Sequence, residues 1–266
     1  FNAISQGAMQ PEEYLEKNDI SATSNSGLKL LPELRTLYNS KKLVAFIDLP
    51  AGHPIIESVG REWQRPSSDG TFEERIAEEK KKSRNLAELL RLREQFMLER
   101  LKELRQNIES GQYPALSRKK NINVGLSLGA AHTPVYHNLY KQEQNVSRSF
   151  SHYPFFYAHP SFEAYRRYSF NKRVDNDLVA RIIFSRILSQ LPECNQEGYA
   201  DLHNFSRFIR AIVNKFDYEE IRAVYNELQS PDSSGLSEEI LYKKIKDKGI
   251  KLPKSEQELE NFIPKK

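Results

Sequence analysis

Two short stretches of the chain carry hydrophobic patterns that are typical of β-strands. The first, KKLVAFIDLP at residues 41–50, is a continuous apolar run with β-branched and aromatic members. Such a run suits a strand that is buried on both faces of a parallel sheet. In the second, Ile122, Val124, Leu126 and Leu128 alternate with other residues, which favours a strand with one apolar face. We therefore expect a strand in each stretch.

A long helical pattern lies between these two stretches. It begins at Thr71 and Glu74, which have the spacing of a capping box. Apolar residues then recur at steps of three and four and give one apolar stripe. They are Leu86, Leu90, Met97, Leu101, Leu104 and Ile108. A helix of about forty residues would span roughly 60 Å, which is long for a simple crossover. We therefore expect a break near the polar sequence KKKSRN at residues 80–85.

A strand, a helical crossover and a second strand form a βαβ unit, in which the strands are parallel and the crossover is right-handed. We therefore predict an α/β fold for residues 1–147, with a partly parallel sheet joined through long helices. Residues 148–266 are expected to form an aromatic-rich segment and a mainly helical extension, because apolar residues recur there at helical spacing. The expected helices cover about residues 175–191, 200–216, 218–229 and 237–248.

Composition narrows the class of protein. The 266 residues include 14 Phe and 13 Tyr, enough apolar side chain for a packed core, which argues against wholesale disorder. Forty basic and 36 acidic residues give a net charge of only +4, whereas a dedicated nucleic-acid binder concentrates positive charge more strongly. The single Cys194 excludes an internal disulfide and fits a reducing compartment. The sequence has no apolar run of membrane-spanning length and no signal peptide, so we expect an intracellular, cytoplasmic protein.

His132 is the first candidate for chemistry. Thr133 and Pro134 favour the start of a helix, so the imidazole is expected between a strand end and the positive end of a helix dipole. That environment favours the neutral ring, which binds a metal ion or accepts a proton. Gly129 and the two alanines after it leave room for a substrate. The alternative is a histidine that only hydrogen-bonds a neighbouring loop.

Charged residues near the expected sheet edge are the other candidates. Arg93 lies within the apolar stripe of the helix, and Glu94 lies at the edge of that stripe. A charge on the core side is costly unless it is paired. Arg93 therefore either extends its head to water or contacts a site carboxylate or a substrate anion. Asp48 and His53 follow the first expected strand, and ligands of open α/β sheets bind at such strand ends. Asp48 suits a turn cap equally well.

Three of these stretches, in this order, resemble motifs of one superfamily. It groups the TraB and Tiki proteins, the ChaN-type haem-binding proteins and the erythromycin-esterase-like enzymes. FIDLPAGHPIIESVGREW resembles its strand that ends in Asp and runs into a helix. LREQFMLERLKEL resembles its helix motif of Arg, an acidic residue, two variable residues and Met, and VGLSLGAAH resembles its Gly-x-x-His strand end. The resemblance covers about residues 40–145.

The family's first motif, an early strand ending in Gly-x-x-His or Gly-Glu-x-His, is not found in residues 1–40. A chain that begins with Phe1 and lacks this motif is expected to be an N-terminally incomplete piece of the domain, or one that has lost the first half-site.

The resemblance implies hydrolysis of an ester or amide bond in a small-molecule or peptide substrate, and some members of the family use a divalent metal. The implied roles are a base or metal ligand (His132), groups that position substrate or stabilise negative charge (Arg93 and Glu94), an orienting carboxylate (Asp48) and substrate contacts (Gly129 and His53). The competing hypothesis is a binding protein without catalysis. It would be a degenerate member of the family kept for structural interaction, or it would hold nucleic acid or a protein partner through the aromatic and basic segment at 149–170 and the C-terminal helices.

Overall fold

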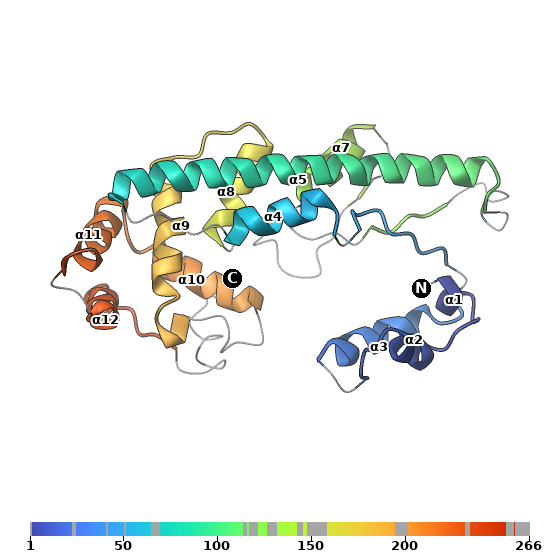
Figure 1. Cartoon of the computed structure of the whole chain (residues 1–266), viewed down its shortest axis with the longest axis horizontal. Coiled ribbons are helices and arrows are strands. Elements are labelled where there is room, and N and C mark those ends of the chain that lie inside the picture. The colour runs from blue at the N-terminus through green and yellow to red at the C-terminus, as the bar shows by residue number, and fades with distance from the viewer. Residues whose placement is uncertain are drawn as a thin grey trace. The chain divides into compact units, whose positions relative to one another are not determined.

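The computed structural model of the chain divides into two compact units, Phe1–Asp48 and Leu49–Lys266, and each is described by itself. The structure describes residues 2–22, 25–40, 42–50, 52–64, 70–113, 116, 122–126, 132–142, 146–147, 159–194, 202–231, 235–253 and 258. The regular secondary structure of these residues is helical, and they contain no strand (Figure 1). The predicted α/β fold with a parallel sheet is therefore wrong.

The N-terminal unit is built from three short helices, α1 (Asn2–Ser5), α2 (Pro11–Lys17) and α3 (Asn25–Leu37). Proline is the first residue of α2, a position where its missing N–H costs no helical hydrogen bond. One buried leucine or isoleucine from each helix forms the small core of the unit. These residues are Ile4, Leu15 and Leu34.

Residues 42–48 of the first predicted strand lie in this unit, and no described residue pairs with them as a strand. The side-chain amide of Asn2 donates to the carbonyl of Val44 (3.0 Å) and accepts from the N–H of Val44 (2.8 Å). Ser5 Oγ donates to the carbonyl of Lys42 at 2.7 Å. Phe46, in the middle of the apolar run, is 71% exposed. The buried strand predicted for residues 41–50 is therefore wrong, because side chains of α1 take the place that a neighbouring strand would occupy.

The second predicted strand is absent as well. Residues 122–126 contain no turn, bend or helix, and all five are exposed. No backbone–backbone hydrogen bond from the described part of the chain reaches them. An alternating pattern favours extended backbone, but a strand also needs a neighbour for its N–H and C=O groups. Leu128, the last residue of the predicted strand, lies outside the described residues.

The long helix α5 (Phe72–Glu109) organises the second unit. Helices α4 (Pro54–Gln64), α7 (Thr133–Gln142) and α8 (Pro160–Ser169) lie along it (Figure 1). The predicted capping box at its start is confirmed. The side chain of Thr71 accepts a hydrogen bond from the backbone N–H of Glu74, and the side chain of Glu74 accepts one from the backbone N–H of Thr71. None of the described helices is both long enough and apolar enough to cross a membrane.

Helix α5 is continuous through residues 80–85, so the predicted break is wrong. Neighbouring elements accept its polar side chains. Lys80 Nζ donates to Asn176 Oδ1 at 2.5 Å, and Lys82 Nζ donates to the carbonyl of Trp63 at 3.0 Å. Because the described residues form no sheet, no crossover between strands limits the length of this helix. The physical reason for expecting a break therefore does not apply.

The core of the second unit gathers around α9 (Asn176–Leu188), which has buried residues on all of its sides. The first turns of α5, helix α8, and three later helices add side chains to the same core. These later helices are α10 (Leu202–Val213), α11 (Tyr218–Leu228) and α12 (Ser237–Asp247), and a short 3-10 turn, η2 (Pro192–Cys194), follows α9. The helices predicted for the C-terminal part are therefore confirmed.

Candidate functional site

Two of the predicted site residues face each other beside the start of α7. Glu94 projects from α5, and His132 directly precedes Thr133, the first residue of α7. Glu94 Oε1 lies 3.5 Å from His132 Nδ1, and the two residues are only 3% and 6% exposed. The structure therefore brings together a carboxylate and an imidazole that lie far apart in the sequence.

This pair has few of the features that catalysis requires. A separation of 3.5 Å is too long for a good N–H···O hydrogen bond, and neither Glu94 Oε1 nor His132 Nδ1 has another hydrogen-bond partner. Within the described residues, no group of three or more His, Cys, Asp or Glu could hold a metal ion. Buried atoms without a hydrogen bond, such as Glu94 Oε1 and His132 Nδ1, lower the stability of the folded chain. The pair is therefore unusual, but it offers very little surface to a substrate.

The other predicted residues are distributed along the chain. Arg93 is half-buried and precedes Glu94 on α5, so their side chains leave the helix about 100° apart. Asp48 closes the N-terminal unit, and the placement of the two units relative to each other is not defined. Gly129 lies outside the described residues. The structure therefore assembles only Glu94 and His132 from the predicted site.

His53 has a structural role at the start of α4. Its Nδ1 accepts a hydrogen bond from the N–H of Ile55 at 3.2 Å, which satisfies one of the free donors of the first helical turn. Its ring lies 6.3 Å from the ring of Phe96 on α5, measured between centroids. These contacts help to fix α4 against α5.

Glu79 is a second buried carboxylate on α5, 4% exposed. Arg186 of α9 binds it with two hydrogen bonds, Nη1 to Oε2 and Nη2 to Oε1, the latter at 2.8 Å. Burial and the nearby Arg186 charge lower the pKa of Lys82, one turn further along α5. The sequence carries a signal for this cluster, because Glu79 follows the buried Ile76 by three residues and so falls on the apolar stripe.

His159 and Ser185 resemble a base and a nucleophile, but their hydrogen bonds exclude that arrangement. His159 Nδ1 accepts from the N–H of Ser161 (3.3 Å) and caps α8. A neutral ring therefore carries its proton on Nε2, which lies 3.4 Å from Ser185 Oγ. Ser185 Oγ donates to the carbonyl of Ile182 at 2.7 Å. His159 therefore has no lone pair left to accept a proton from this serine.

Burial, together with the charges of Arg186 and Arg210, lowers the pKa of His159 to about 4. Arg210 also binds Glu163 of α8, which a second arginine, Arg167, contacts at 2.7 Å. Burial alone would raise the pKa of Glu163, but these two guanidinium groups outweigh it and hold the pKa below its usual range. His159 and Glu163 therefore make structural contacts that join α8 to α9 and α10.

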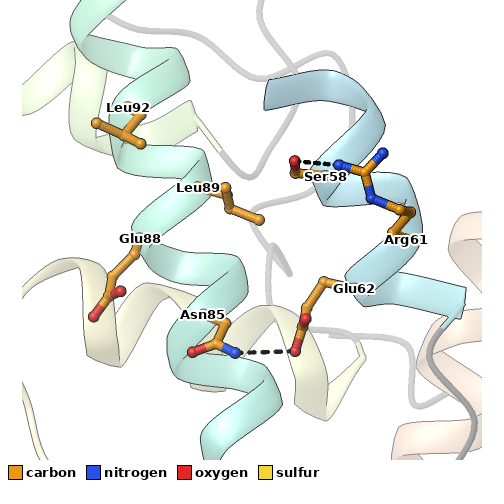
Figure 2. A pocket seen from close by; sticks show the side chains of 7 residues that line it. All are labelled: Ser58, Arg61, Glu62, Asn85, Glu88, Leu89 and Leu92. Atoms are coloured by element: carbon orange, nitrogen blue, oxygen red, sulfur yellow. Dashed lines mark hydrogen bonds between the residues drawn. The ribbon is translucent and has the colours of Figure 1, made fainter. Parts of the chain in front are cut away.

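An open groove lies on the other side of α5, between this helix and α4 (Figure 2). Its volume is about 590 Å³, within the range of roughly 300–1,000 Å³ that is common for binding sites. Its described lining consists of Ser58, Arg61, Glu62, Asn85, Glu88, Leu89 and Leu92. Leu89 points from α5 toward α4 in Figure 2, and Leu92 is 48% exposed. The described lining of the groove therefore combines two leucines with polar and charged side chains.

Carboxylates dominate the charge of this groove. Arg61 donates to Ser58 Oγ at 2.8 Å and lies 3.7 Å from Glu57 on its own helix, so its charge is already offset. Asn85 of α5 donates to Glu62 of α4 at 3.2 Å. Glu88 is exposed and forms no ion pair with a described residue. The groove is therefore locally acidic, although the whole chain carries a net charge of +4.

Comparison of the chain with protein-family models, with curated proteins and with solved structures finds no match. The resemblance to the TraB and esterase-like superfamily therefore remains a prediction. The sheet edge that was expected to carry hydrolysis is absent from the described residues. The α/β description of the chain is therefore wrong, whereas the TraB-like and esterase-like hydrolase function stays a prediction.

Proposed function

We propose that the chain is a non-catalytic helical binding protein, and that the groove between α4 and α5 holds an amphipathic helix of a partner protein. The partner helix carries basic residues on both sides of its apolar face. One observation carries this proposal: Leu89 and Leu92 lie in an open groove whose rim includes the carboxylates of Glu62 and Glu88.

The shape of the groove favours a helix as the partner. Leu89 and Leu92 are three residues apart, so they form a short ridge on one face of α5. A third helix packs between two others when its side chains enter the spaces beside such ridges. Covering Leu92, which is half exposed, removes apolar surface from water and favours binding. An apolar stripe at three- and four-residue spacing is the complementary surface.

The charge of the groove favours lysine or arginine beside that stripe. Glu88 has no ion pair with a described residue, and Glu57 offsets the charge of Arg61. A basic partner gains attraction from the carboxylates, which speeds association and selects against acidic partners. The gain from each exposed ion pair is small, about 0.2–1 kcal/mol, so the leucines supply most of the affinity.

The buried pair of Glu94 and His132 supports binding without catalysis. A general acid or base must come within hydrogen-bond reach of the substrate atom that it serves. Glu94 and His132 are at most 6% exposed, and the groove is lined by other residues of α5. A substrate would reach this pair only through an opening to solvent, and neither residue is among the described residues that line the groove.

The test uses the full chain and two designed peptides of about 18 residues, each with leucines at three- and four-residue spacing. One peptide carries lysines beside the leucines, and the other carries glutamates at the same positions. We expect the basic peptide to bind at least tenfold more tightly in a calorimetric titration. Leu92→Asp should weaken that binding at least tenfold, and Glu88→Lys should narrow or reverse the preference between the two peptides.

Leu236→Asp is the matched control, because Leu236 is 43% exposed and precedes α12, away from the groove. This variant should bind the basic peptide as the unchanged chain does. Equal losses in Leu92→Asp and Leu236→Asp would contradict the groove as the binding site. Binding of single-stranded DNA at this groove, with steep salt dependence, would contradict a protein partner.

A further inference from the structure

Residues 122–126, with the sequence INVGL, place three apolar side chains in solvent. Ile122, Val124 and Leu126 are 39%, 63% and 38% exposed. Their backbone N–H and C=O groups have no backbone partner in the described part of the chain. An exposed segment with β-branched residues and no proline, whose backbone no described residue pairs with, is a template for pairing with another strand.

The other predicted strand differs in this respect. At Val44, the side-chain amide of Asn2 already binds both the N–H and the C=O, and Ser5 binds the carbonyl of Lys42. The N-terminal unit therefore satisfies one edge of that segment itself. Among the described residues, no comparable side-chain contact reaches the backbone of residues 122–126. This contrast selects INVGL as the available segment.

The residue pattern of INVGL is symmetric about Val124. If two copies pair antiparallel with Val124 opposite Val124, then Ile122 of each copy lies opposite Leu126 of the other. All six apolar side chains then share one face of the two-stranded ribbon, because alternate residues of a strand point to the same face. A pattern that complements itself in this way is what a two-fold interface requires.

We infer that residues 122–126 form an antiparallel β-bridge with the same segment of a second copy of this chain, with Val124 on the two-fold axis. A Cβ atom added at Gly125 would meet no other atom within 4 Å, so the face that carries residues 123 and 125 is open there. Stable interfaces bury about 1,600 Å², and a ribbon of five-residue strands buries less. The dimer is therefore weak and forms at high protein concentration.

Charge exchange at Val124 tests this arrangement in the full chain by sedimentation velocity over a concentration series. Val124→Asp and Val124→Lys each place like charges opposite each other, which disfavours pairing. Each variant alone should raise the dimer dissociation constant at least tenfold. An equimolar mixture of the two should restore dimers, and native mass spectrometry should identify them as one copy of each variant.

Asn123→Asp with Asn123→Lys is the matched control, because residue 123 lies opposite residue 125 in this register and on the other face of the ribbon. Those variants should change the dissociation constant less than threefold. Three results would overturn the proposal: an unchanged chain that stays monomeric at millimolar concentration, dimers that persist in Val124→Asp, or a mixture of the charged variants that fails to recover dimers.

Discussion

Helix α5 presents two faces that differ in how they use charged residues. One face buries Glu79 and Glu94, each no more than 4% exposed. The other lines the groove with Glu88, Leu89 and Leu92. Glu79 has a bidentate arginine partner, and Glu94 has only an imidazole nitrogen at 3.5 Å. Burial of a carboxylate on this helix therefore does not by itself indicate function. Glu79, which has the more complete set of hydrogen bonds, joins α5 to α9.

The largest change in stability is expected when Glu79, on the buried face of α5, is replaced. Glu79→Leu leaves Arg186, whose side chain is 36% exposed, without its partner and should lower the free energy of unfolding by about 4 kcal/mol, since two hydrogen bonds between charged groups are lost, each contributing about 2 kcal/mol. The double variant Glu79→Leu with Arg186→Leu should recover most of this loss. Urea denaturation of Glu79→Leu, of Arg186→Leu and of the double variant measures these changes in the free energy of unfolding. Additive losses would contradict a coupled pair.

The next effect is a loss of stability in acid that depends on His159. The pKa of His159 is lowered to about 4 in the folded chain by burial first and by two arginines, against about 6.5 in an unfolded chain. The unfolded state therefore binds the proton more readily. Stability should fall as pH drops from about 6.5 toward 4, by about 3 kcal/mol in total.

His159→Asn tests this dependence on pH. Asparagine keeps an acceptor for the N-terminus of α8 but does not titrate. Denaturation midpoints between pH 7 and pH 4 should therefore decline less steeply in this variant. Parallel slopes in the two proteins would assign the acid sensitivity to other groups.

The smallest change in stability is expected when Glu94 or His132 is replaced, in contrast to replacement of Glu79. Because neither facing atom is hydrogen-bonded, replacing both by apolar groups removes unsatisfied atoms and is close to neutral. Glu94→Leu and His132→Leu should each change the free energy of unfolding by about 1 kcal/mol or less. Their coupling in a double-mutant cycle should stay below about 0.5 kcal/mol. A coupling as large as that of the Glu79 pair would contradict this view.

Sequence periodicity predicts the last four described α-helices through α12 and is misleading for the two expected strands. Three- and four-residue spacing predicts α9 to α12, and Thr71 with Glu74 predicts the start of α5. The runs at 41–50 and 122–128 indicate extended backbone, but pairing depends on a neighbour that local sequence does not specify. In the first run, Asn2 occupies the place of that neighbour at Val44.

The candidate site is predictable only in part, for a similar reason. Glu94 and His132 are noticeable in the sequence because a charged residue borders an apolar stripe and a histidine precedes a helix, and the structure brings them together. The groove residues Glu88 and Leu92 occupy positions that resemble any solvated helix face. Their significance arises from the approach of α4, which the sequence pattern does not indicate.

The most direct test of the central claim follows the leucine methyl groups of α5 by NMR while the full chain is titrated with the basic amphipathic peptide. Leu89 and Leu92 line the groove, whereas Leu86 and Leu90 belong to the buried face. A groove that holds a partner helix predicts saturable shifts for Leu89 and Leu92, with much smaller shifts for Leu86 and Leu90. Larger shifts on the buried face, or no shift at millimolar peptide, would contradict a binding function for this groove.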